Sequence, residues 1–134
     1  MNKTKAARIP RGERGAAAVE FALVLPLLVA LVLGIVDFGR AYNQQITLTQ
    51  IAREGARLAS LGITDYKARL VSAAPASLGL KLTDISGTTC TLSSLPTSDA
   101  IVTVSKTFTF TAPRLVGAAL PLTLKGKATM PCLG

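Results

Sequence analysis

Residues 16–36 read AAAVEFALVLPLLVALVLGIV, and this apolar stretch decides the fold. Only one of its side chains, that of Glu20, is charged. At a rise of about 1.5 Å per residue, a helix of this length extends about 31 Å, close to the roughly 30 Å thickness of the hydrocarbon core of a bilayer. The sequence therefore predicts one transmembrane helix over residues 16–36.

The charges that flank this stretch predict its orientation. Residues 1–14 contain five cations and one acid, a net charge of +4, whereas Asp37 and Arg40 leave the far flank nearly neutral. Because Lys and Arg beside a span stay on the cytoplasmic side, we expect a single-pass protein of the cytoplasmic (inner) membrane with its N-terminus inside. The rest of the chain is then extracytoplasmic.

The high overall charge does not indicate a nucleic-acid partner. The net charge is +8 and the sequence pI about 10.1, but half of that charge lies in the basic tip that adjoins the apolar run. No aromatic side chains are interleaved with the cations of that tip, as a nucleic-acid surface would require. We expect a membrane partner and no nucleic acid.

A cleaved secretory signal is the alternative to a retained anchor. The apolar core of such a signal is normally shorter, and no convincing small-x-small cleavage site follows Val36. A secreted periplasmic binding protein would start beyond Val36 in its mature form. The apolar stretch favours a retained anchor over that alternative.

Glu20 and Pro26 are unusual residues for a span. A carboxylate within an apolar span costs roughly 2.5–3.5 kcal/mol on insertion scales, so Glu20 is expected to have a partner, unless it lies near the interface and reaches water. Pro26 deletes the helix hydrogen bond to the carbonyl of Ala22, which membrane helices tolerate where packing compensates. We expect a kinked but continuous helix at Pro26.

Two clusters of residues within and beside this stretch carry a family resemblance. Arg14-Gly15 is followed by AAAVEFALVLP over residues 16–26, and residues 34–40 read GIVDFGR. Together they resemble the TadE-like family, the minor pilins or pseudopilins of the tight-adherence (Flp) type IV pilus. The core of the resemblance covers residues 11–62, and a looser similarity of pattern continues to the C-terminus.

The resemblance implies processing by a prepilin peptidase. In such proteins the cut follows a glycine that stands shortly before a glutamate and an aromatic residue, which implies cleavage between Gly15 and Ala16, ahead of Glu20 and Phe21. Gly12 does not fit, because no glutamate stands five residues beyond it. The resemblance implies that Glu20 aligns incoming subunits by pairing with the new amine on a neighbour. The implied partners are the prepilin peptidase, other pilin or pseudopilin subunits and the pilus assembly platform.

The helix is expected to continue beyond the membrane over residues 37–62. Apolar residues recur there at helical spacing, from Phe38, Tyr42 and Ile46 to Leu48, and a more polar side offers an ion pair between Glu54 and Arg57 at i, i+3. Gly62 is a plausible C-cap. The alternative is an anchor followed by a separate juxtamembrane helix. Small residues that would permit close helix packing are Gly34, Gly39, Ala41, Ala52, Gly55, Ala56 and Ala59.

Residues 63–134 predict a small α+β domain. A short helix with Thr64 or Asp65 at its N-terminus is stopped by Pro75, and residues 75–80 form a turn. The period then changes to two, weakly over 80–86 and clearly over 100–112 and 122–132, which predicts two or three antiparallel strands on the long helix.

The apolar stretch between Pro113 and Pro121 is too long for a tight hairpin. It is expected to form a loop with a turn of helix, or, because it is apolar, to contact a partner or the membrane instead. The inward side chains expected are Val102, Val104, Phe108 and Phe110, then Leu122, Leu124, Ala128, Met130 and Cys132.

The two cysteines favour an intramolecular disulfide between Cys90 and Cys132, with free thiols or an intermolecular bond as alternatives. Both lie on the expected outer side, where disulfides persist. With no histidine and only two cysteines, we expect no metal site and no cofactor. The absence of histidine excludes Ser–His and Cys–His catalysis, and the acids are dispersed, so the chain is not expected to be an enzyme.

Three functions follow as hypotheses. The first is a minor pilin or pseudopilin processed by the prepilin peptidase, with four segments: a basic cytoplasmic leader (1–15), the transmembrane helix (16–36), its amphipathic continuation (37–62) and the extracytoplasmic domain (63–134). The second is an uncleaved, membrane-anchored assembly factor of the same pilus. The third is the secreted binding protein that starts beyond Val36.

Overall fold

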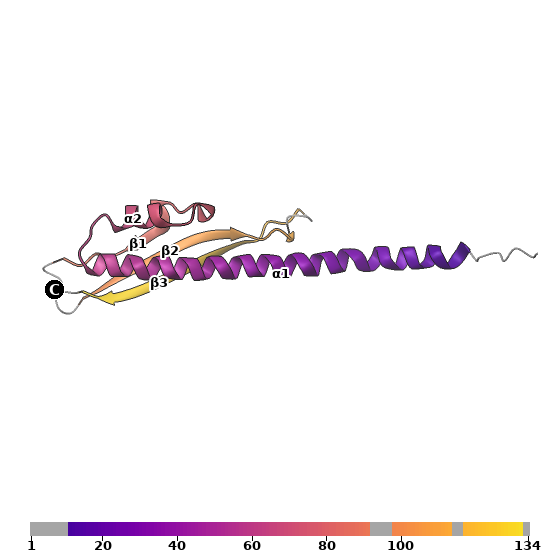
Figure 1. The fold of residues 1–134 in the computed structure, drawn as a ribbon, viewed down its shortest axis with the longest axis horizontal. Helices are drawn as coiled ribbons and strands as arrows, with labels where there is room; N and C mark the ends of the chain where they lie inside the picture. Colours follow the sequence, from indigo (N-terminus) through magenta and orange to yellow (C-terminus); the bar gives the residue numbers. More distant parts are fainter. Residues whose placement is uncertain (1–10, 92–97, 114–116, 133–134) are drawn as a thin grey trace, which may run out of the picture.

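One long helix, α1 (Arg11–Ser60), organises the whole molecule. The computed structural model describes residues 11–91, 98–113 and 117–132. Residues 1–10 of the predicted leader, and Leu115 and Val116 of the apolar stretch, lie outside the described residues. In Figure 1 the remaining elements gather along one half of α1, while its N-terminal half extends alone.

The elements after α1 form the small domain. The short helix α2 (Tyr66–Ala73) comes first, followed by two 3-10 turns, η1 (Ala76–Leu78) and η2 (Leu82–Asp84). Three strands then build the sheet: β1 (Ile85–Gly87), β2 (Asp99–Thr109) and β3 (Pro121–Pro131). This arrangement confirms the predicted α+β fold, a long helix with a second short helix and an antiparallel sheet.

The sheet has the order β1-β2-β3, and both pairs are antiparallel. Strands β2 and β3 pair along their whole length, from Asp99 opposite Pro131 to Thr109 opposite Pro121. The β2–β3 hairpin therefore lies along α1, and its connecting end points toward the free half of the helix (Figure 1). The β2–β3 loop, residues 110–120, connects the two strands at that end.

The core lies between α1 and the sheet. The inward face of β2 alternates with its outward face, as the period of two predicts, and Val102, Val104 and Phe108 are buried. Tyr66 and Leu70 of α2 cover another part of this core. The residues of α1 that enter it are nearly all small: Ala41, Leu48, Ala52, Gly55, Ala56 and Ala59.

The structure divides the apolar residues of the C-terminal half of α1 into a buried set and an exposed set. Phe38 is 71% exposed and Tyr42 62% exposed, and Ile46 is exposed as well. These three residues follow one another at i, i+4 and so form one stripe, but the sheet packs against the small-residue face instead, because small side chains let its backbone approach closely. The small residues from Ala41 onward thus pack against the domain, whereas Gly34 and Gly39 face open space.

Local signals at the ends of the helices are partly confirmed. Helix α1 ends at Ser60, and Gly62 takes a positive φ of 73° with its N–H donating to the carbonyl of Ala59. Asp65 occupies the N-cap of α2 but forms no capping bond, because its carboxylate pairs with Arg69 at 3.0 Å instead. The expected pair of Glu54 and Arg57 is present at 2.7 Å.

Two expectations for the strands were wrong in part. Most of the segment 80–86 is not a strand, since η2 occupies Leu82–Asp84 and β1 begins only at Ile85. On β3, Leu124 is buried, but Leu122 and Met130 are exposed. On β3 only Leu124 and Gly126, near the middle of the strand, are buried, so alternation alone overestimates the length of the buried face.

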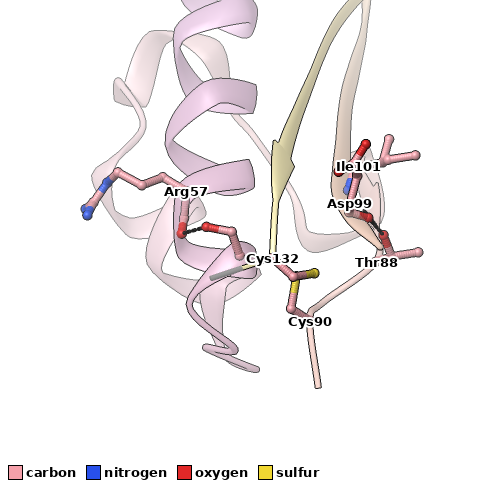
Figure 2. Close-up of a disulfide and its surroundings, with 7 residues drawn as sticks. Arg57, Thr88, Cys90, Asp99, Ile101 and Cys132 are labelled. Carbon is pink, nitrogen blue, oxygen red and sulfur yellow. Dashed lines mark hydrogen bonds between the residues drawn. A yellow bond between two sulfur atoms is a disulfide. The ribbon is translucent and has the colours of Figure 1, made fainter. Parts of the chain in front are cut away.

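A disulfide joins Cys90 and Cys132, with a Cα–Cα distance of 5.7 Å. Figure 2 shows the bridge beside the last turns of α1. The N–H of Cys90 donates to the carbonyl of Ala59 at 3.0 Å, which places the bridge against the end of that helix. The bridge therefore ties the C-terminal end of β3 to the segment that follows β1, at the end of the domain farthest from the free half of α1.

Candidate functional site

The N-terminal half of α1 presents its apolar side chains to the surroundings. From Gly15 to Val36 every residue is exposed except Leu33, which is half-buried. The most apolar 18-residue window of the helix has a mean hydropathy of 2.7, and none of that window is buried. A soluble protein does not leave such a surface bare, so this half of α1 is a helix able to span a membrane.

The residues that the family resemblance singles out lie at the start of this bare segment. Gly15, Ala16, Glu20 and Phe21 all belong to α1 and are all exposed. Glu20 forms no ion pair with any side chain that the structure describes, and Ala17, Phe21 and Val24 border it. The helix continues through Pro26 without interruption. The isolated chain thus brings no partner of its own to Glu20 within the described residues.

Asp37, the first residue after the predicted span, has a role that the sequence did not indicate. Its side chain is only 2% exposed. The carboxylate accepts hydrogen bonds from the backbone N–H groups of Thr111 and Ala112, the latter at 2.8 Å. Both belong to the start of the β2–β3 loop, more than 70 residues away in the chain, so Asp37 fastens that loop to α1 where the bare half begins.

Arg40 completes this junction. Its guanidinium donates to the Thr111 hydroxyl at 3.0 Å and lies 3.5 Å from the carboxylate of Asp37, while its side chain stays more than half exposed. It also lies over the ring of Phe108, 5.8 Å from the ring centroid. We name Asp37, Arg40, Thr111 and Ala112 the junction.

The carboxylate of Asp37 is held in its charged form. The N–H of Ala112 has the largest effect and lowers the pKa of Asp37 below its ordinary value of 3.8, against the opposing effect of burial. Thr111 and Arg40 lower this pKa as well. Asp37 is therefore ionised at neutral pH, which strengthens its hydrogen bonds to the loop.

Sequence reasoning took Asp37 and Arg40 only as markers of the membrane boundary. A signal was present in the sequence, because an acid directly after an apolar span either stays in water or has a partner, as holds for Glu20. The partner itself was not predictable, since backbone N–H groups carry no mark in a sequence. Only the register of β2 along α1 brings Thr111 and Ala112 to this carboxylate.

No catalytic arrangement accompanies these features in the described part of the chain. An open groove of about 270 Å³ lies between α1 and η1 and contains neither a carboxylate nor a cysteine. It therefore offers hydrogen-bond donors but no acid–base pair. No group of three or more acidic, Cys or His side chains gathers as a metal site among the described residues. The groove is lined by Arg40, Asn43, Gln44, Thr47, Pro75, Ser77 and Leu78.

These features define a class: a chain with one exposed helix able to span a membrane, joined to a small disulfide-linked α+β domain. The family model described as TadE-like protein matches residues 15–57. The match confirms the resemblance over residues 15–57, within the first helix, and the TadE-like family is one associated with a pilus assembly system and a membrane. That family consists of pilus components and is not known for enzymes. No curated protein and no solved structure matches the chain.

Proposed function

We propose that this chain is a minor pilin or pseudopilin of a tight-adherence (Flp) type IV pilus. A prepilin peptidase cuts it between Gly15 and Ala16 at the inner membrane, and the mature chain then assembles with other pilin subunits. The observation that carries this proposal is the TadE-like match, which begins at Gly15 and runs through the exposed half of α1 into the half that bears the domain.

The surroundings of Gly15 and Ala16 support the cleavage. A Cβ at Gly15 would meet no described atom within 4 Å, so no other described element packs on this side of α1 at the proposed cut. Glycine also adopts backbone conformations closed to other residues, and a protease site must unwind locally from the helix. Cleavage removes the basic leader and leaves a free amine on Ala16.

The exposure of Glu20 supports its assembly role. The carboxylate lies about one helical turn beyond Ala16, in a span where an unpaired charge is costly. The isolated chain supplies no described partner to Glu20. The amine of a neighbouring mature subunit is a partner of the right charge, and pairing in an apolar filament core offsets the burial of both groups.

The exposed stripe of Phe38, Tyr42 and Ile46 supports contact with other subunits. This stripe continues the apolar surface of the span toward the C-terminus of α1, on a side of the helix that the domain does not cover. The exposed apolar surface of α1 is longer than the hydrocarbon core of a bilayer is thick. The bilayer alone therefore cannot cover all of it. Helix-to-helix packing between subunits accounts for the excess.

The experiment that tests the assembly role compares Glu20→Ala with Glu54→Ala in cells that build the pilus. Glu54 is an exposed carboxylate of the same helix outside the span and serves as the matched control. We expect both variants to reach the membrane fraction, and only Glu20→Ala to be lost from pili sheared off the cell surface. Recovery of Glu20→Ala in sheared pili at the level of Glu54→Ala would contradict the role.

A further inference from the structure

The β2–β3 loop is an exposed apolar feature of the domain. It lies at the end of the domain nearest the bare half of α1. Its described residues beyond Gly117 are all exposed, and Leu120 is 57% exposed. Leu122 at the start of β3 is exposed on the same end. A polar loop would need no cover, but this one places apolar side chains at its surface without a partner in the described chain. The exposed set is Ala118, Ala119, Leu120, Pro121 and Leu122.

The junction fixes the position of this loop along α1, relative to the predicted span. Asp37 directly follows the predicted span and holds the N–H groups of Thr111 and Ala112. The loop continues from there, and the N–H of Ala118 closes it by donating to the carbonyl of Pro113 at 2.9 Å. The apolar set is therefore tethered at the level where the bare half of α1 begins (Figure 1).

Leu33 belongs to the predicted span and marks the last turn of α1 before Asp37. It is the one residue between Gly15 and Val36 that is half-buried rather than exposed. It lies one turn before Asp37 on the same face of α1, about 6 Å farther toward the N-terminus. On this face the β2–β3 loop contacts Asp37, and Leu33, half-buried, is the next residue of that face toward the N-terminus, so the apolar end of the domain lies beside the last turn of the predicted span.

The charges of this region suit a lipid surface. From residue 100 to residue 134 the chain has no Asp or Glu, and its charged residues there are all Lys or Arg. Arg40, itself part of the junction, has a side chain that is more than half exposed and so presents a cation beside the end of the predicted span. Apolar side chains below and cations above are the pattern of a segment that lies in a membrane interface, where the cations favour anionic headgroups.

We propose that the apolar end of the β2–β3 loop inserts shallowly into the bilayer beside α1, as a second membrane contact. The occupant of this surface is lipid, with Leu120 at the acyl-chain boundary and Arg40 at the headgroups. The contact holds the domain upright against the membrane before assembly. This inference rests on the proposed span of residues 16–36 and goes beyond the pilus role.

The test uses the full-length chain in vesicles of phosphatidylcholine and phosphatidylglycerol. The sequence contains no Trp, so each introduced Trp is the only one in the protein. Leu120→Trp reports on the loop and Leu27→Trp on the span. Ile101→Trp, exposed on the same hairpin eight residues from the end of β2, is the matched control. Acyl chains brominated at the lipid tails quench a Trp that they contact, and retention of the disulfide on a non-reducing gel checks folding.

We expect Leu120→Trp to shift its emission to the blue and to lose much of its fluorescence to brominated lipid, less completely than Leu27→Trp. Ile101→Trp should lose almost none. Ala119→Trp is a second loop position and should follow Leu120→Trp. Quenching of both loop variants no stronger than that of Ile101→Trp, with Leu27→Trp strongly quenched, would overturn the loop contact and leave the span intact.

Two other outcomes also decide the matter. A blue-shifted Leu120→Trp that brominated lipid does not quench would mean that protein, such as a second copy of the chain, covers the loop, which overturns lipid as the occupant. An unquenched Leu27→Trp would refute the proposed span itself, and the loop contact with it. The failure of the loop proposal is thus distinct from the failure of the span.

Discussion

At the scale of the residue, Asp37 links the two halves of the molecule. It terminates the apolar stretch in the sequence, and in the structure it is a buried acceptor for two backbone N–H groups of the β2–β3 loop. A buried carboxylate is tolerated where it is fully hydrogen-bonded, and here the bonds come from a loop that the folded sheet must deliver. The junction therefore forms only when the domain is correctly packed on α1.

The lowered pKa of Asp37 predicts a dependence of stability on pH. Because its pKa is lower in the folded state than its ordinary 3.8, the charged carboxylate stabilises the fold above that value, and this contribution is lost as the pH falls from there through the folded pKa. We expect Asp37→Asn to lower the thermal midpoint at pH 7 and to lose less further stability in acid than the wild type. Unfolding followed by circular dichroism from pH 7 down to acid measures both.

Asp65→Asn is the matched control for this prediction. Asp65 is an exposed acid that pairs with Arg69 on the surface, where ion pairs contribute little. Its midpoint should stay near that of the wild type. Asp84 and Glu54, whose pKa values are also lowered, are present in every variant and cancel in the comparison. Equal midpoints and equal acid profiles for Asp37→Asn and Asp65→Asn would show that the junction does not stabilise the fold.

Single residues were predictable from the sequence where their chemistry is local. Gly62 with its positive φ, the pair of Glu54 and Arg57, and the stop of α2 before Pro75 depend on neighbours within a few positions. The partners of Asp37 depend on a register between segments far apart in the chain. Periodicity carries no information on such a register, so the junction required the structure.

At the scale of the element, the apolar pattern of α1 did not distinguish the residues that pack against the domain from those that stay exposed. Phe38 and Tyr42, large members of the apolar pattern on this helix, are exposed, and the sheet packs on alanines and glycines instead. Small side chains on α1 allow the backbone of β3 to lie close to the backbone of α1, and large side chains would hold the two apart. A hydrophobicity pattern gives more weight to the large side chains, and in a membrane protein these also serve lipid and neighbouring subunits.

Gly126 tests this close approach of β3 to α1. A Cβ on Gly126 would overlap the backbone carbonyl of Leu48, and neither backbone yields easily. We expect Gly126→Ala to destabilise the domain by about 1–3 kcal/mol, the usual cost of overpacking. Chemical denaturation of the full chain in detergent, followed by circular dichroism, measures the loss in the free energy of unfolding.

Gly39→Ala provides the control, since a Cβ at Gly39 meets nothing within 4 Å. In an exposed helix interior this change should stabilise by up to about 1 kcal/mol, because alanine has the higher helix propensity. A stability of Gly126→Ala equal to or above that of Gly39→Ala would refute the close contact between β3 and α1.

At the scale of the whole molecule, the chain divides into a bare helix and a small domain held at both ends. The junction holds the end nearest the span, and the disulfide holds the far end beside the last turns of α1 (Figure 2). The composition and the apolar run predicted this division, because length and hydropathy bound it. The sequence favoured the pairing of the two cysteines because it contains only these two and both lie on the expected outer side.

The disulfide is expected to contribute much of the stability of so small a domain. It joins residues 42 positions apart, and on the chain-entropy model a loop of that size contributes about 4 kcal/mol. We expect the double variant Cys90→Ala/Cys132→Ala to lose stability on that order. Denaturation of the wild type with and without reductant, beside the double variant, measures it. A double variant as stable as the oxidised wild type would refute this contribution.

The proposal that the chain is a processed pilin depends most directly on the N-terminus of the mature protein. Mass spectrometry of the chain recovered from the membrane fraction of cells that express the prepilin peptidase determines it. The account predicts a mature chain that starts at Ala16, with the full-length form accumulating when the peptidase is absent. A chain that keeps Met1 in the presence of the peptidase would contradict the account and favour an uncleaved assembly factor, and a start beyond Val36 would contradict the retained anchor as well.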